Sequence, residues 1–369
     1  MNKILITGVT GFVGGATLEN IINNNLSCDL LLLVRADSYG DAVRRVHDNM
    51  RKFNVSENKL SKITEGNILL GDLGKPDLYL DDPRLDSITH VINCAAIASF
   101  GKNPMIWKVN VDGTLALARR MAKVKGLQRF LHVGTAMSCT PEPNTLVAED
   151  THFIESKNHF VEYTHSKLMV EKLMRKHCPE MPLLFARPSI VVGHTKHGCK
   201  PSSSIFWVFN MGLMLQKFMC SMKDRIDVIP VDYCAQAIIM LLNSDLPNGE
   251  IVHISAGDEH CVQFKEIDNA IADAMQRQPV GDKYAKVSYD VLLTMRRDLK
   301  KIFGPCNERI MLKAMYLYGQ FAELNVRFDN HKLLSLGMPK PPKFTDYIGL
   351  CVSSTRHLSI PQQMMVDFK

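Results

Sequence analysis

The chain has 369 residues, of which 46% are hydrophobic and 22% charged, a composition typical of a globular protein and not of a disordered one. This length predicts two domains, or one large domain with an additional lobe. The 44 Lys and Arg residues against 38 Asp and Glu residues give a net charge of +6. Such a mild, diffuse surplus suits anionic ligands and does not indicate a nucleic-acid partner.

No targeting or membrane segment is predicted. Residues 1–7 resemble a buried strand without a basic start or a cleavage site. The least charged stretch, residues 201–216, is too short and too interrupted by Ser and Asn to span a bilayer. The ten cysteines have no metal-ligand spacing, so we expect no metal site and reduced thiols in a cytoplasmic protein.

Up to about residue 193, short apolar runs alternate with helical segments. The runs are rich in Ile, Leu and Val and mostly lack strict alternation, which is typical of strands buried on both faces of a parallel sheet. They are residues 3–7, 30–34, 67–70, 90–94, 129–133 and 183–186. Helical spacing is found at residues 16–23, 111–122 and 163–176. This order predicts an α/β fold with a doubly wound parallel sheet, the Rossmann type.

After residue 193 the pattern changes. Residues 225–230 and 249–255 predict short strands, and the expected helices are residues 265–276, 289–302, 307–324 and a last short one near 345–351. We therefore expect an NAD(P)-binding Rossmann domain formed by residues 1–193 and about 225–255. A smaller, helix-rich substrate-binding lobe would comprise residues 194–224 and 256–369.

Three glycines follow the first predicted strand directly and open the first helix: Gly8, Gly11 and Gly14. The pyrophosphate of a dinucleotide needs a tight turn, a close backbone approach and close packing of the helix on the strand, and glycine serves all three. The N-terminus of the helix adds free N–H groups and a positive dipole end. The sequence therefore predicts a dinucleotide site at this turn.

The end of the second strand indicates which dinucleotide binds. An NAD site places an Asp or Glu there, whereas this chain has Arg35, with Arg44 and Arg45 on the following helix. A guanidinium can hold a 2′-phosphate with two parallel bonds, so NADPH is favoured over NADH. The alternatives are that these arginines are merely solvated, and that Asp37 allows NADH.

Tyr163 and Lys167 are four residues apart in a predicted helix, which puts both on one face. Hydride delivery to a carbonyl creates an alkoxide that needs a proton donor, and a nearby ammonium lowers the pKa of a phenol. Thr135, at the end of the fifth strand, can donate a second hydrogen bond to the same oxygen. The three residues predict carbonyl reduction.

Together these motifs resemble those of the extended short-chain dehydrogenases/reductases. The resemblance rests on residues 7–14 (TGVTGFVG), 71–73 (GDL), 93–96 (NCAA), 110–114 (NVDGT) and 231–233 (VDY), on the Tyr163 and Lys167 pair, and on Arg187-Pro188. It implies that Asp72 contacts the adenine, that Ala95 lines the cofactor path, that Lys167 holds the nicotinamide ribose and that Asn110 supports a proton relay. Cys94, and Thr135 where many members have Ser, depart from the commonest pattern.

The expected catalytic residues are Thr135, Tyr163, Lys167 and Asn110. The expected cofactor contacts are Gly8, Thr10, Gly11, Phe12, Val13, Gly14, Arg35, Arg45, Asp72, Leu73, Ala95, Lys167, Pro188 and Ser189.

Within this superfamily the chain most resembles the thioester reductase and fatty acyl-CoA reductase (male-sterility) branch. The pointers are residues 32–36 (LLVRA), the long connection before residues 71–73, and residues 228–233 (VIPVDY). The resemblance implies NADPH-driven reduction of an acyl thioester, on CoA or an acyl carrier protein, to an aldehyde and in a second step to an alcohol. Subunit pairing is common in the superfamily, so a homodimer is compatible with it.

Two other functions stay open at this point. One is an oxidoreductase or epimerase acting on a free carbonyl or alcohol, a sterol-like compound or a nucleotide sugar. The other is a cofactor-binding sensor without turnover, against which the intact Tyr163, Lys167 and Thr135 speak.

Residues 205–222 form either an acyl pocket or lid, as flexible methionines suggest, or a buried helix of the second lobe. Lys196, His197 and Lys200 either meet a phosphopantetheine phosphate or belong to a solvated loop.

Overall fold

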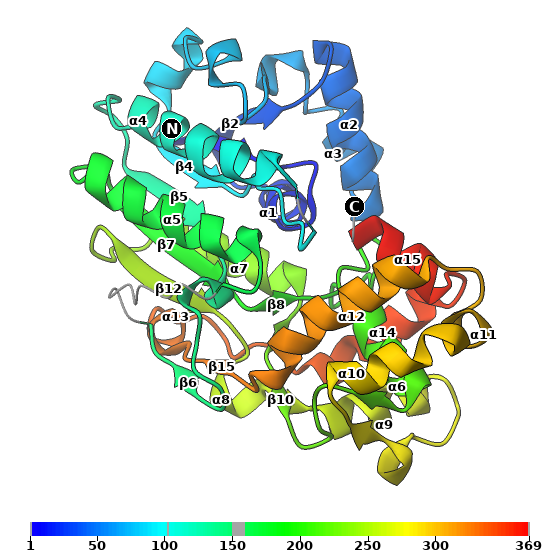
Figure 1. Cartoon of the computed structure of the whole chain (residues 1–369). Coiled ribbons are helices and arrows are strands. Elements are labelled where there is room, and N and C mark those ends of the chain that lie inside the picture. The colour runs from blue at the N-terminus through cyan, green and yellow to red at the C-terminus, as the bar shows by residue number, and fades with distance from the viewer. Residues whose placement is uncertain (1, 102, 150–158, 368–369) are drawn as a thin grey trace.

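The computed structural model describes residues 2–101, 103–149 and 159–367 (Figure 1). A parallel sheet of seven strands, in the order β12-β7-β5-β4-β1-β2-β3, organises the first part of the chain. The strands are β1 (Asn2–Thr7), β2 (Cys28–Val34), β3 (Ile68–Leu70), β4 (His90–Asn93), β5 (Arg129–Val133), β7 (Leu183–Pro188) and β12 (Glu250–Ile254). The predicted α/β fold with a doubly wound sheet is confirmed.

The strands are apolar on both sides because helices cover both faces of the sheet. Ile4 and Ile6 of β1 belong to one buried core, whereas Leu5 between them belongs to the other. The first core is shared with α1 (Phe12–Asn23), α2 (Tyr39–Lys52) and α7 (Val231–Leu242), and the second with α4 (Thr114–Met121) and α5 (Glu162–His177). The strand order reverses beside β1, and ligands of such sheets bind at this crevice, outside the carboxyl ends of the strands.

The helix predicted at residues 111–122 begins earlier than expected. A π-helical segment, η4 (Trp107–Gly113), leads directly into α4. A Cβ atom at Gly113 would lie 1.9 Å from the carbonyl oxygen of Leu73, so only glycine lets this segment approach the loop after β3. Asp72 and Leu73 are thereby held against the start of α4.

A second, helix-rich lobe has its own core, centred on Phe206, Trp207, Met211 and Phe344. Its helices are α6 (Phe206–Leu215), α9 (Phe264–Ala274), α10 (Tyr289–Thr294), α11 (Leu299–Phe303), α12 (Glu308–Glu323), α14 (Phe344–Thr355) and α15 (Ile360–Asp367). The single helix predicted at 289–302 is divided by a 3-10 turn at Met295–Asp298. The helix near 345–351 was expected to be the last, which is wrong, because α15 follows it and packs on α6.

Short strand pairs complete the fold. They are β6 (Leu146–Val147) with β15 (Arg327–Phe328), β8 (Ile190–Val191) with β11 (Val228–Ile229), β9 (Lys217–Phe218) with β14 (Ala285–Lys286), and β10 (Arg225–Ile226) with β13 (Val262–Gln263). The short helices α3 (Glu57–Leu60), α8 (Gly257–His260) and α13 (His331–Ser335) lie in connecting segments. Near its C-terminal end the chain returns to the sheet, where α13 packs on β12. The domain boundaries at 193, 225 and 255 stay a prediction.

The structure bears on three features considered in the sequence: the cysteines, membrane-spanning helices and metal-ligand groups. All ten cysteines are free thiols, as predicted. Within residues 2–101, 103–149 and 159–367, no helix combines the length and apolarity needed to cross a bilayer. In the same ranges, no group of three or more His, Cys, Asp or Glu side chains is arranged to hold a metal ion.

Candidate active site

The glycine turn has the geometry that a bound pyrophosphate requires. Gly8 has φ +77°, a conformation that favours glycine, and the N–H of Gly11 donates to its carbonyl at 2.9 Å. A Cβ at Gly14 would lie 2.4 Å from the carbonyl oxygen of Gly8, so α1 packs too closely on the turn for any larger residue. Gly11 is the N-cap of α1, and the free N–H groups of the first helical turn follow it. The cradle therefore fits a dinucleotide, with Thr10, Phe12 and Val13 partly exposed around it.

Asn49, a residue that the sequence motifs do not mark, braces this turn. Its side chain is buried on α2, and its Nδ2 donates to the carbonyl oxygen of Val9 at 2.9 Å and to that of Gly11 at 3.1 Å. The Gly11 carbonyl also accepts from the N–H of Gly15 at 3.1 Å, so Asn49 adds a second donor there and supplies a donor to the Val9 carbonyl. The sequence indicates this role only through the place of Asn49 among the apolar positions of an amphipathic helix.

The residues expected at the adenosine end lie together. The Arg35 guanidinium is 3.8 Å from the Asp72 carboxylate, and the Arg35 side chain is 74% exposed. Arg45 reaches back and donates to the backbone carbonyl of Arg35, so it supports Arg35 and does not itself project beside it. Arg44 instead pairs with Asp41 on its own helix. An exposed guanidinium beside the glycine turn is available to a 2′-phosphate.

The ends of β1 and β4 are fastened to each other below the cofactor crevice. The Thr7 hydroxyl donates to Asn93 Oδ1 at 2.7 Å and accepts from the Ala95 N–H at 3.0 Å. A Cβ at Gly8 would lie 2.8 Å from the Ala95 nitrogen. Ala95 therefore lies directly beside the glycine turn, while Leu73 is buried in the core that the sheet shares with α4.

The Lys167 ammonium and Thr135 both lie at the carboxyl end of β5. Lys167 is 2% exposed, and its Nζ donates to the carbonyl oxygen of Val133 at 2.7 Å. Thr135 follows two residues later and caps the 3-10 turn η5 (Ala136–Cys139), on which α5 packs. Tyr163 is half-buried one turn before Lys167 on the same face of α5. Among the described residues no hydrogen bond joins the Tyr163 hydroxyl to Thr135 or Lys167.

The titration behaviour of this pair differs from the sequence-based expectation. Burial raises the pKa of Tyr163 to about 12, and burial lowers the pKa of Lys167 to about 8 against the opposing charges of Cys94 and Glu171. The expected lowering of the phenol pKa by the ammonium is therefore wrong for the protein without ligand. Lys167 is directed to the Val133 carbonyl, and desolvation of Tyr163 dominates.

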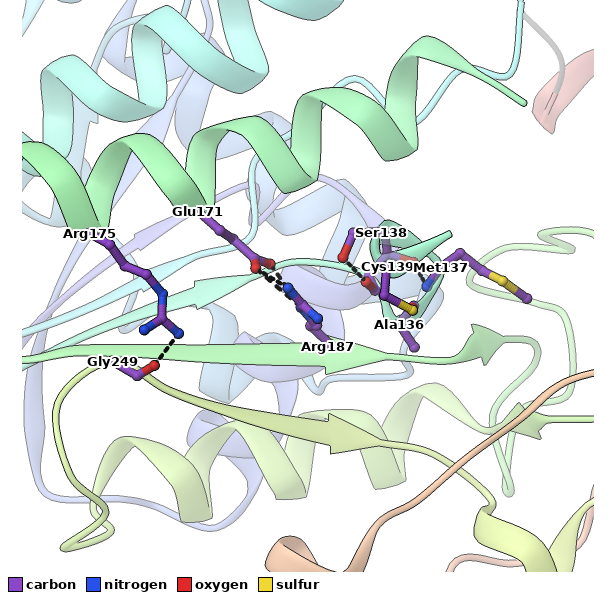
Figure 2. Close-up of polar contacts among 9 residues, drawn as sticks. Ala136, Met137, Ser138, Cys139, Glu171, Arg175, Arg187 and Gly249 are labelled. Atoms are coloured by element: carbon purple, nitrogen blue, oxygen red, sulfur yellow. Dashed lines mark hydrogen bonds and ion pairs between the residues drawn. The ribbon is translucent and has the colours of Figure 1, made fainter. Parts of the chain in front are cut away.

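Behind Lys167, α5 carries a buried ion pair that sequence reasoning missed (Figure 2). Glu171 lies one turn after Lys167, and its carboxylate accepts from Arg187 Nη2 at 2.5 Å and from Nε at 3.1 and 3.2 Å. The side chains are 0% and 4% exposed. Two features of the sequence could have indicated this pair: an acidic residue four positions after Lys167, and the arginine of the Arg187-Pro188 motif.

Asn110 connects two parts of the site through its amide. Its Oδ1 accepts from the N–H of Ile97 at 2.8 Å, and its Nδ2 donates to the Ile97 carbonyl at 3.1 Å and to the Ser166 hydroxyl at 3.0 Å. Ser166 in turn donates to the carbonyl of Tyr163 at 2.7 Å. Asn110 therefore ties the loop after β4 to α5, and its role in a proton relay stays a prediction.

Of the remaining candidates, Pro188 and Ser189 lie at the edge of the sheet where the cofactor is expected, whereas the segment 205–222 is mostly buried and the two lysines are exposed. Pro188 ends β7 and Ser189 follows it, with its N–H bound to the Ile254 carbonyl at 2.9 Å, so both lie at the carboxyl edge of the sheet. By contrast, the segment 205–222 forms the buried helix α6 and its continuation: Trp207 and Phe209 are core residues, which supports the core alternative over a lid. Lys196 and Lys200 are exposed, as in a solvated loop.

Known proteins that are similar to this chain include reductases and reductase domains of the same fold. The profile of the family described as male sterility protein matches residues 6–238. The chain is 24% identical over 281 residues to fatty acyl-CoA reductase wat of Drosophila melanogaster, which covers 64% of this chain and 53% of that protein. It is 25% identical over 269 residues to the nonribosomal peptide synthetase hkm10 of Aspergillus hancockii, which covers 68% of this chain and 26% of the synthetase. The chain thus spans less than two thirds of either relative.

Among solved structures, the terminal R domain from the myxalamid PKS-NRPS biosynthetic pathway superposes with a TM-score of 0.78 at 21% identity. The match covers 97% of this chain and 91% of the R domain, so the shared fold includes the second lobe. The family profile covers well over half of the chain and includes the glycine turn, Thr135, Tyr163 and Lys167. The chain belongs to the male sterility protein family, a branch of the extended short-chain dehydrogenases/reductases.

Proposed function

We propose that the protein reduces an acyl thioester to an aldehyde with NADPH. The observation that carries this proposal is the position of Tyr163, Lys167 and Thr135 at the carboxyl edge of the sheet, where the glycine turn also lies. The relatives named as a fatty acyl-CoA reductase and an R domain support the thioester as substrate class. CoA and an acyl carrier protein are the two candidate thiols, and a cytoplasmic location and a homodimer are part of the same proposal.

In the proposed reaction, Tyr163 and Thr135 act on the carbonyl oxygen of the thioester. A bound nicotinamide supplies the hydride that the thioester carbonyl carbon accepts. Tyr163 donates a proton to the carbonyl oxygen, and the Thr135 hydroxyl shares the developing negative charge. The product is a hemithioacetal, whose C–S bond then breaks while the hydroxyl proton passes to sulfur. This leaves an aldehyde and a free thiol, and a second round of reduction converts the aldehyde to the alcohol.

Lys167 contributes by position and charge. Its ammonium is held at the end of β5 by the Val133 carbonyl, next to where the nicotinamide ribose lies in the proposed complex. In that complex a ribose hydroxyl would accept a hydrogen bond from the Lys167 ammonium. Arg35 favours the 2′-phosphate and hence NADPH over NADH.

A substrate panel tests the proposal. Purified protein is mixed with NADPH or NADH and with acyl-CoAs, acyl carrier protein thioesters, free aldehydes, alcohols and nucleotide sugars, and the absorbance of the reduced nicotinamide is followed. We expect oxidation of NADPH with thioesters. Turnover with free carbonyls, alcohols or nucleotide sugars only would support the alternative function and refute this one.

The variant Tyr163→Phe tests the proton donor. It keeps the ring and removes the hydroxyl, so turnover should fall by about 10²- to 10⁴-fold while the Kd for NADPH stays near that of the wild type. Retained turnover would contradict the assignment of Tyr163.

A further inference from the structure

Aromatic side chains from separate parts of the chain converge beside Tyr163. We call the group of Phe100, Phe160, Tyr318 and Phe321 the aromatic wall. Phe100 lies in the loop after β4, Phe160 precedes α5, and the other two lie on α12 of the second lobe. The wall therefore exists only because the second lobe folds against the sheet.

Phe100 is the centre of the wall. Its ring centroid lies 6.2 Å from that of Tyr163 and 5.0 Å from that of Tyr318. Phe321 is 5.2 Å from Phe100, and Phe160 is 5.3 Å from Phe321 in an edge-to-face arrangement. Each step is an ordinary aromatic contact, so the rings form an unbroken apolar strip that starts at the proton donor.

Exposure increases along this strip. Tyr318, 6% exposed, packs edge-to-face at 5.4 Å on the fully buried Trp207, which closes the inner end. Phe100 and Phe321 are half-buried, and Phe160 is 39% exposed at the outer end. Partly exposed rings that adjoin a reactive hydroxyl and continue to the surface are typical of a binding surface for an apolar ligand.

The loop that carries Phe100 is also fixed. Asn110 binds both the N–H and the carbonyl of Ile97, three residues before Phe100, and the Ser99 hydroxyl accepts from the N–H of Gly101 at 3.1 Å. A wall held in this way loses little conformational freedom when a ligand packs on it.

We propose that the aromatic wall is the surface on which the hydrocarbon part of the acyl group packs, with Phe321 as the main residue that determines chain-length specificity. This inference rests on the proposed function. The carbonyl carbon lies at Tyr163, and the chain runs over Phe100 and Phe321 toward Phe160 and the surface. Carbons beyond Phe160 reach solvent and add no binding.

The test is a chain-length series of saturated acyl-CoAs from butanoyl to hexadecanoyl. Full burial of a methylene group strengthens binding about fourfold, and coverage on one side about twofold. We expect kcat/KM with NADPH to rise about twofold to fourfold per added methylene and then level off where the chain leaves the wall. Phe321→Ala should flatten this rise, and Phe321→Leu, which keeps apolar bulk, should retain most of it.

Tyr316→Ala is the matched control. Tyr316 is also an aromatic residue of α12, is 41% exposed and packs on Tyr289 at 4.8 Å, away from the aromatic wall. It should leave the chain-length profile unchanged. A wild-type profile without chain-length dependence, or the same profile in Phe321→Ala and wild type, would overturn the inference.

A binding measurement separates this inference from the proposed function. The Kd values of the same acyl-CoAs are measured by calorimetry for the wild type and the three variants in the presence of NADP⁺. If no thioester is reduced but binding still tightens with chain length and depends on Phe321, the proposed function fails and the aromatic wall stands. If binding shows no such dependence, the wall fails as well.

Discussion

The buried ion pair behind Lys167 offers a quantitative test of how the site is built. Replacing Glu171 by Gln keeps the shape of the side chain and removes the negative charge that faces the Arg187 guanidinium in this pair, whose side chains are 0% and 4% exposed. Breaking a buried pair from one side costs about 3–5 kcal/mol. We expect the lower end, about 3 kcal/mol, because the Gln oxygen can still accept from Arg187.

The assay is urea unfolding followed by circular dichroism. Two further proteins give the controls. In the double variant Glu171→Leu with Arg187→Met, an apolar pair replaces both charges, so stability should stay close to that of the wild type. Glu259→Gln breaks an ion pair between exposed side chains, Lys340 and Glu259, and should change the unfolding curve little. A loss of less than about 1 kcal/mol in Glu171→Gln would refute the reasoning.

The same variant reports on the active site. The carboxylate of Glu171 opposes the desolvation that lowers the pKa of Lys167 to about 8. Without this charge the pKa of Lys167 falls further, so the alkaline limb of the pH profile of kcat should move to lower pH. The double variant should show the same movement despite its restored stability, which separates the electrostatic effect from a structural one.

Three further predictions concern the cofactor and the lysine. Arg35→Ser should raise the KM for NADPH about 10- to 100-fold, because a charge-assisted contact is worth about 1.5–3 kcal/mol, and leave the KM for NADH nearly unchanged; an equal effect on both would contradict the 2′-phosphate contact. Asn49→Ala should weaken NADPH binding measured by calorimetry, since the Val9 carbonyl loses its side-chain donor and the Gly11 carbonyl keeps only its backbone donor; an unchanged Kd would contradict the bracing role. Between the pKa of Lys167 in the folded chain, about 8, and its ordinary value of 10.5, the unfolded chain binds more protons, so this group makes the free energy of unfolding rise with pH. Lys167→Met should remove that rise in urea unfolding, and an unchanged slope would contradict the lowered pKa.

Much of the cofactor site could be predicted because its signals are local. Parallel strands bring their carboxyl ends to one edge, so the order of the motifs along the chain already indicates that Gly8, Asp72, Ala95 and Thr135 are neighbours. The residues that hold these motifs in place could not be predicted in the same way. Asn49 acts on a turn about forty residues away, and the pairing of Glu171 with Arg187 depends on how α5 lies on β7.

The substrate side was harder to predict. Apolar composition drew attention to residues 205–222, but a helix that is mostly apolar packs into a core, and most side chains of α6 are buried there, with Met214 exposed. The aromatic wall joins Phe100 and Tyr163 to Phe321 of α12, and nothing in the spacing of these residues shows that they meet. That contact depends on how the second lobe packs against the first.

The contacts of Asn110 give a reason for the π-helical conformation of the segment η4. In a π-helix the side chains are spaced at more residues per turn than in an α-helix, so η4 turns Asn110 inward, where it reaches Ile97 and Ser166 together. Ile97 precedes the loop that carries Phe100, and Ser166 holds the carbonyl of Tyr163. A single buried amide thus holds Tyr163 and the loop that carries Phe100 in place relative to each other. In the proposed complex the same amide positions the carbonyl at Tyr163 and the acyl chain on the aromatic wall together, which offsets the local cost of the π-helical turn.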